Sequence, residues 1–155
     1  MFRRVLRGAA AGAAATTALH AATYLDMAIR GRPASSTPEK TVEAMADSQG
    51  VQIPGQGSER ENRLAGLGPL SGIVTGVGVG VAYGVMDVLH LRPRGLAGVL
   101  FAGGGAMAFS NVTMTKYGVT DPSTWNAEAW VSDLLPHLAY GTVLTSTYSL
   151  ALDPH

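Results

Sequence analysis

The sequence predicts an all-α integral membrane protein, a bundle of four transmembrane helices with a short amphipathic helix in the first long loop. Hydrophobic residues make up 46% of the 155 residues and charged residues only 14%, whereas about a quarter of a soluble domain is charged. Four apolar segments are each long enough to supply the roughly 20 residues that a helix needs to cross a bilayer. Glycines also recur every four residues in one uncharged segment, a spacing typical of helices that pack closely in lipid.

The charge balance and the lack of cysteine exclude several functions. The formal net charge is zero, so no positive field would gather nucleic acid, and no nucleic-acid partner is expected. The absence of cysteine excludes disulfides, thiolate catalysis and cysteine-ligated zinc. The mean hydropathy of +0.18 is low for a membrane protein, because 20 glycines and one polar stretch reduce it. Membrane lipid is therefore the expected surrounding.

The first apolar segment covers about residues 5–29. It starts among three arginines: Arg3, Arg4 and Arg7. Gly8 and Gly12 lie four residues apart on it and predict a packing stripe. A rival interpretation is a cleaved signal, because basic residues precede a run of glycine and alanine. The apolar run continues to Ile29, which is long for a secretory signal, so we expect a membrane span.

A polar loop of about residues 30–63 follows and contains the sequence STPEKTVEAMADSQG. Thr37 can cap a helix and Pro38 suits a first turn, so a helix of about ten residues is expected here. Val42 and Met45 share one face of it, which favours a position on the membrane surface or beneath the bundle. The glycines and proline of GVQIPGQGSEREN then predict a linker.

The second apolar segment, about residues 64–89, carries five glycines at four-residue spacing: Gly68, Gly72, Gly76, Gly80 and Gly84. In water each glycine weakens a helix by roughly 1 kcal/mol relative to alanine. In lipid no water competes for the backbone, and the missing side chains let another helix approach closely. We therefore expect the five glycines to form a helix-packing groove. The groove can close this bundle, or it can bind a second copy or another membrane protein.

The third apolar segment covers about residues 96–115 and carries a second stripe of small residues: Gly98, Ala102, Ala106 and Ser110. Three glycines at 103–105 are expected to loosen the helix beside it. Arg92 and Arg94 precede this segment, so the unbalanced arginines gather at one end of the spans. Both termini are therefore expected in the cytoplasm of a multi-pass inner-membrane protein.

The fourth apolar segment, about residues 129–152, has the densest set of polar residues. Asp133 and His137 are four apart and share a helix face, and Tyr140 lies three further on. Pro136 removes a backbone donor, which predicts a kink beside the pair. A carboxylate can orient an imidazole for proton transfer near neutral pH. We favour the plainer interpretation, in which Asp133 lies at the interface and His137 is a buried packing residue.

Other polar residues have simple structural roles. Asp26 and Arg30, four apart, are expected to form an ion pair. Asp87 and His90 are expected to anchor a helix end at the membrane interface. Asn111 can donate a hydrogen bond across helices.

No catalytic motif occurs in the sequence, so the chain is not expected to be an enzyme. Gly-x-Gly-x-x-Gly, Gly-x-Ser-x-Gly and His-Glu-x-x-His are all absent from it. His20 and His137 fall at similar depths and could in principle hold a haem iron. Abundant glycine and scarce aromatic lining argue against it, so we expect no cofactor and no metal.

The order of segments resembles a group of small bacterial four-span inner-membrane proteins. The resemblance rests on TYLDMAIRGRPASSTPE, on two glycine-rich segments, and on YGVTDPSTW leading into WVSDLLPHLAYG. The order of segments is similar to that of the YagU-type proteins, and the residues of these motifs resemble more closely those of membrane proteins from high-GC Gram-positive bacteria. It implies a fold and a location, without a reaction. The residues themselves leave two functions to choose between. The first, which we expect, is a structural or interaction role through glycine packing; the alternative is a small proton-responsive conduit or sensor using Asp133 and His137.

Overall fold

The computed structural model describes residues 1–151, and these form an all-α fold in which no strand occurs. This part of the chain forms five α-helices and one 3-10 turn: α1 (Phe2–Arg30), α2 (Thr37–Ser48), α3 (Ser58–Val88), α4 (Gly95–Lys116), η1 (Pro122–Thr124) and α5 (Ala127–Leu150). Four long helices and a short one in the first loop match the predicted order. Position 152, where the fourth predicted segment ends, lies outside the described residues.

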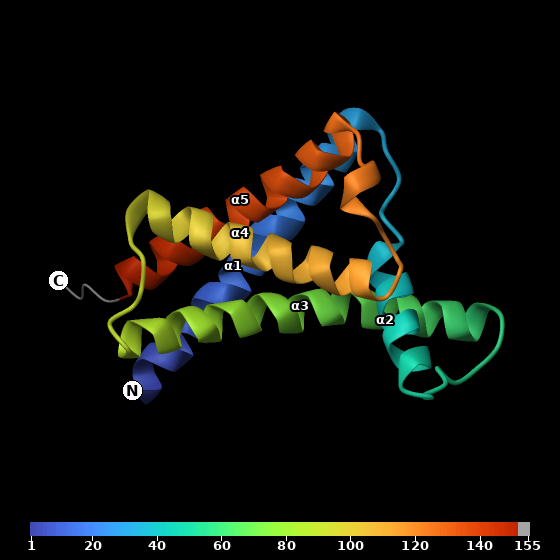
Figure 1. The fold of residues 1–155 in the computed structure, drawn as a ribbon, viewed down its shortest axis with the longest axis horizontal. Coiled ribbons are helices and arrows are strands. Elements are labelled where there is room, and N and C mark those ends of the chain that lie inside the picture. The colour runs from blue at the N-terminus through green and yellow to red at the C-terminus, as the bar shows by residue number, and fades with distance from the viewer. Residues whose placement is uncertain (152–155) are drawn as a thin grey trace.

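The helix α1 is the centre of the arrangement, because it packs against both α3 and α5. The helix α4 packs mainly against α5 and only slightly against α3. Figure 1 shows α1 and α5 side by side, with α3 passing across them. The N-terminus, the α3–α4 turn and the end of α5 lie at one end of the bundle, and α2 lies at the other (Figure 1).

The first loop contains more helix than the sequence predicts. The helix α2 has 12 residues, with Pro38 in its first turn. The linker prediction is wrong for residues 58–62, which form the start of α3. Glu59 and Glu61 lie in the first turn, where acidic side chains favour the helix. Arg63 also pairs with Glu59 at 2.6 Å, which links successive turns.

The short connection between α4 and α5 is built from local hydrogen bonds. The Asp121 carboxylate accepts bonds from the hydroxyl and the amide of Ser123, at 2.7 and 2.9 Å. These bonds hold the pKa of Asp121 below its usual value. Asn126 then caps α5 by accepting a bond from the amide of Ala129 at 2.8 Å. The sequence DPSTWN therefore specifies both a turn and a helix start.

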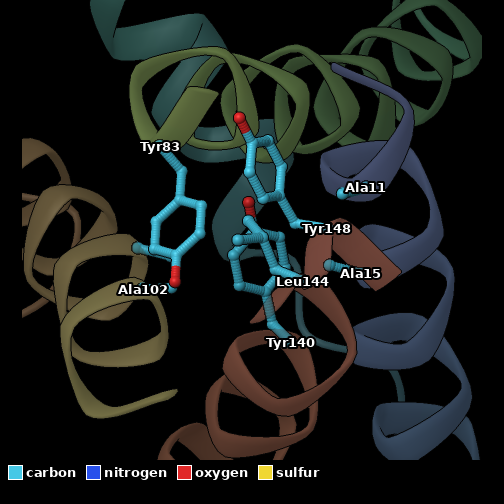
Figure 2. Packing of buried hydrophobic residues seen from close by; sticks show 8 residues of the cluster. Ala11, Ala15, Tyr83, Ala102, Tyr140, Leu144 and Tyr148 are labelled. Carbon is cyan, nitrogen blue, oxygen red and sulfur yellow. The ribbon is translucent and has the colours of Figure 1, made fainter. Parts of the chain in front are cut away.

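The main cluster of buried apolar residues consists of alanines and tyrosines, with a single leucine. Figure 2 shows the rings of Tyr83, Tyr140 and Tyr148 between the helices, with Ala11 and Ala15 of α1 on one side. The largest fully buried side chains are these three tyrosines and one leucine, Leu144. Small residues bring the backbones together, and the tyrosine rings fill the space that remains.

Two of the described helices, α3 and α4, are long and apolar enough to cross a membrane by length and composition. The helices α1 and α5 are also long, but neither meets the same criterion; arginines begin α1, and α5 contains Asp133 and His137. The fold therefore agrees with membrane association through two helices. The predicted four-span bundle is not established by these criteria.

Candidate functional site

The helices α1 and α3 touch backbone to backbone at their glycines. A Cβ atom built on Gly80 would lie 2.7 Å from the Cα atom of Gly12, and one built on Gly12 would lie 2.7 Å from the carbonyl oxygen of Gly76. Further along, a Cβ on Gly8 would collide with the carbonyl of Gly80 and approach Gly84. Real Cβ contacts essentially never fall below 3.0 Å. Glycine is therefore the only residue that fits along this line of contact.

Of the five glycines spaced four residues apart on α3, the first two do not contact α1. Gly68 faces α2, where an added Cβ would lie 2.9 Å from the amide nitrogen of Glu39. Gly72 is exposed and has nothing within 4 Å, so the prediction of one continuous groove is wrong there. Four residues exceed one helical turn by about 40°, so a four-residue stripe winds around the helix. It meets α2 first and α1 later, and Gly72 lies between them.

A second glycine contact, which the sequence analysis missed, joins α4 to α5. A Cβ on Gly141 would lie 2.8 Å from the amide nitrogen of Gly103, and one on Gly103 would collide with the carbonyl oxygen of His137. The helix α4 runs unbroken from Gly95 to Lys116, so the expected loosening at 103–105 does not occur. The signal available in the sequence was the four-residue step from His137 to Gly141.

Asp133 and His137 lie together, as their spacing requires. The His137 Nδ1 atom is 2.7 Å from the backbone oxygen of Asp133 and 3.3 Å from its Oδ1 atom. The Asn111 side chain of α4 donates to Asp133 Oδ2 at 2.8 Å, so the predicted hydrogen bond across helices is confirmed. His137 is buried, and Asn111 Oδ1 is buried with no hydrogen-bond partner among residues 1–151.

Tyr140 and His20 do not join this pair. The Tyr140 hydroxyl donates to the carbonyl oxygen of Gly76 at 2.6 Å, so this side chain belongs to the glycine contact. His20 is half-buried on α1, and its ring centroid lies 6.0 Å from that of Tyr24. No group of three or more histidine, aspartate or glutamate side chains in the described part of the chain could hold a metal ion.

A buried ion cluster lies at the end of the bundle that contains the N-terminus. Asp87 and Arg92 are each 7% exposed, and Arg92 Nε lies 2.8 Å from Asp87 Oδ1. Arg4 Nε lies 3.3 Å from Asp87 Oδ2, and the Tyr148 hydroxyl donates to the same oxygen at 3.2 Å. The Arg92 guanidinium also lies 5.1 Å from the ring centroid of Tyr148 and 5.8 Å from that of Tyr83.

This cluster gives Asp87 a role that the sequence analysis did not indicate, as a buried ion-pair partner between helices. Asp87 lies inside the bundle and joins α1, α3, α5 and the α3–α4 turn, whereas His90 is exposed. Asp87 follows Gly84 by three residues, so it lies on the buried face of α3. That spacing was the signal in the sequence.

The opposite ends of α1 and α5 are joined by a more exposed network. Asp26 and Arg30 form the predicted ion pair at 2.5 Å. Arg30 also lies 2.6 Å from Glu128 and bonds to Ser132, and Arg32 lies 2.6 Å from Asp26. Ion pairs that water reaches in this way contribute little to the free energy of unfolding. They fix the register of α1 against α5 more than they stabilise the fold.

Comparisons with known proteins add no family: no family model, curated protein or solved structure matches the chain. The function must therefore be argued from the geometry. Most buried polar groups bond to one another or to backbone carbonyls, an arrangement that holds helices together. The Asp133 and His137 pair is the part of the site that could also exchange a proton.

Proposed function

We propose that this chain is an integral protein of the bacterial inner membrane, with four spanning helices and a structural or interaction role. The observation that carries the proposal is the outward apolar face of every long helix, including α1 and α5. Large exposed apolar side chains occur on all four: Leu6, Leu25, Leu70, Val74, Phe101, Phe109, Val131 and Leu135. Soluble monomers rarely expose such large apolar surfaces. Hydrocarbon around the bundle would cover these side chains.

The polar atoms inside the bundle support the same environment. The buried Thr16 hydroxyl donates to the carbonyl of Gly12, four residues earlier, at 2.8 Å. The exposed Thr142 hydroxyl does the same to Leu138 at 2.8 Å. Such bonds satisfy a hydroxyl without water. The buried faces of α1 and α5 carry mainly small residues and tyrosine.

The glycine contacts support a role in closing the bundle itself. Gly8 and Gly12 are occupied by α3, and Gly103 is occupied by α5, so these stripes are not free for another chain. A second copy or another membrane protein would have to bind the outer faces. The protein then acts by packing, without catalysis and without a cofactor.

Cysteine labelling tests the four spans against a fold in which only α3 and α4 cross. The chain has no cysteine of its own, so single cysteines at Phe2, Ser58, Leu91, Thr124 and Leu150 report one position each. With cytoplasmic termini, an impermeant maleimide should label Ser58→Cys and Thr124→Cys in intact cells. The variants at Phe2, Leu91 and Leu150 should be labelled only after permeabilisation. Labelling of Phe2→Cys together with Ser58→Cys in intact cells would exclude a crossing by α1.

A second candidate function is a proton-responsive conduit or sensor using Asp133 and His137. The observation that favours it is the buried, unpartnered Asn111 Oδ1 atom beside the pair, because a buried acceptor without a partner is a group to which a water molecule can donate a hydrogen bond. Proton flux in liposomes distinguishes the two functions. A conduit requires flux in the wild type and its loss in His137→Gln and Asp133→Asn. A structural pair gives no flux in any of the three and only lower thermal stability in the variants.

A further inference from the structure

Although the net charge of the chain is zero, its charged side chains are distributed unevenly between the two ends of the bundle. The end with the N-terminus, the α3–α4 turn and the end of α5 has one described carboxylate, Asp87, against five arginines: Arg3, Arg4, Arg7, Arg92 and Arg94. The opposite end has nine carboxylates and six basic side chains. We call the end with the five arginines the arginine end.

Both oxygens of the one described carboxylate at the arginine end, that of Asp87, already have partners. Arg92 occupies Asp87 Oδ1, while Arg4 and the Tyr148 hydroxyl share Oδ2. The cluster therefore keeps one positive charge. Within residues 1–151, the other three arginines have no salt bridge to a carboxylate: Arg3, Arg7 and Arg94. An external anion would balance this surplus.

Arg4 is held in a position suited to such an anion. Its Nη1 atom donates to the backbone oxygen of Asp87 at 3.0 Å, and its Nε atom faces the Asp87 carboxylate. Its side chain is nevertheless 41% exposed. A guanidinium fixed on one side loses little conformational freedom when a phosphate binds its other side. Arg7 lies one helical turn further along α1, on the same face.

Two helix N-termini at the arginine end reinforce this preference. The helices α1 and α4 begin there, and neither has an acidic residue in its first turn or a side-chain cap. The helices that begin at the opposite end, α2, α3 and α5, each have glutamate in the first turn. Helix N-termini attract negative charge. The arginine end therefore lacks the anions that the chain supplies at its other end.

Exposed apolar side chains among the arginines indicate an amphiphile. Phe2, Leu91 and Leu96 are 73%, 66% and 73% exposed. We infer that the arginine end binds anionic phospholipids, with headgroup phosphates on Arg3, Arg4 and Arg7 of α1 and on Arg94 before α4, and with acyl chains along Phe2 and Leu96, respectively. This inference rests on the proposed membrane-spanning fold, and it commits to a lipid of the leaflet beside the arginines. Binding of basic clusters to anionic lipid is a general property of such surfaces.

Native mass spectrometry in detergent tests the inference without depending on topology. The purified protein is mixed with equal amounts of phosphatidylglycerol and phosphatidylcholine, and bound lipids are counted. We expect a preference for phosphatidylglycerol that falls about fivefold per arginine removed in Arg3→Gln, Arg7→Gln and Arg94→Gln and in their combination. The control removes three cations from the opposite end, Lys40→Gln, Arg63→Gln and Lys116→Gln, and should keep the wild-type preference.

Three outcomes would overturn the inference: no preference in the wild type, an equal loss in the control, or displacement of the bound lipid by millimolar inorganic phosphate. The last would show a site for free phosphate. Labelling of the single-cysteine variants that carry all the arginines separates this result from the proposed function. Correct labelling with no lipid preference rejects the lipid site alone, whereas failed labelling rejects the four-span fold whatever lipid is bound.

Discussion

At the residue scale, the most consequential side chain is Asp87. It is a buried carboxylate that neutralises a buried arginine and joins three helices and a turn. A buried pair of this kind gains little over an apolar pair of the same size, but breaking it leaves an uncompensated charge. Asp87 therefore specifies how the helix ends meet at the arginine end.

Replacing Asp87 with asparagine should destabilise the protein strongly. The substitution keeps the shape of the side chain and removes its charge, so Arg92 remains buried without a counter-charge. We expect a loss of about 3 kcal/mol in the free energy of unfolding, measured by denaturant titration in detergent. Glu43→Gln is the matched control, because Glu43 pairs with Arg60 at 2.6 Å with about a third of each side chain exposed. The control should cost less than about 1 kcal/mol. Equal losses would contradict a structural role for the buried cluster.

At the element scale, the pairing of α1 with α3 depends on glycine at specific turns. The contact runs through Gly12 and Gly80, where two backbones meet without a side chain between them. Gly72, two turns earlier on α3, faces no other helix. The same residue type on one helix therefore has two different roles.

Gly80→Leu should therefore disrupt the bundle, and Gly72→Leu should not. A leucine at position 80 would have to push α1 away, so we expect a loss of about 3 kcal/mol or more, with a lower thermal midpoint in detergent. Leucine at position 72 faces the surroundings and should leave the midpoint near that of the wild type, or slightly higher, because leucine favours helix. If both variants melt like the wild type, close packing at Gly80 is wrong.

At the scale of the whole molecule, the apolar residues are arranged opposite to those of a soluble bundle. Leucine, valine and phenylalanine lie outside, while alanine, glycine and tyrosine lie inside. This arrangement suits hydrocarbon, because lipid provides no hydrophobic force between helices and close packing must hold them together. The proposed membrane location predicts how new surface charges behave.

An arginine on the outer face should prevent membrane insertion. Val74 is 65% exposed near the middle of α3, and Leu135 is 54% exposed on α5. Each substitution with arginine should cost about 2.5 to 3.5 kcal/mol at the centre of a bilayer. The measured result would be a clear loss of protein from the membrane fraction. Glu61→Arg, at the start of α3, should remain in that fraction. Leu135→Arg protein that stays in the membrane fraction at the wild-type amount would instead mean that α5 does not cross the membrane.

The sequence by itself determined the helices, because their lengths, caps and turn residues are local properties. The Asp26–Arg30 and Asp133–His137 pairs, four residues apart, also followed from helix geometry alone. So did the preference for glycine at close contacts. These predictions needed only the 3.6-residue period and the chemistry of neighbouring side chains.

Only the tertiary structure decided which helix faces which. The sequence could not show that Gly68 meets α2 while Gly80 meets α1, because the slow rotation of a four-residue stripe matters only once the neighbours are placed. It could not bring Arg4, Asp87 and Tyr148 together, since they are separated by more than sixty residues. It also could not show that Gly103 and Gly141 touch. Contacts between distant segments depend on the packing of whole helices, which no local pattern encodes.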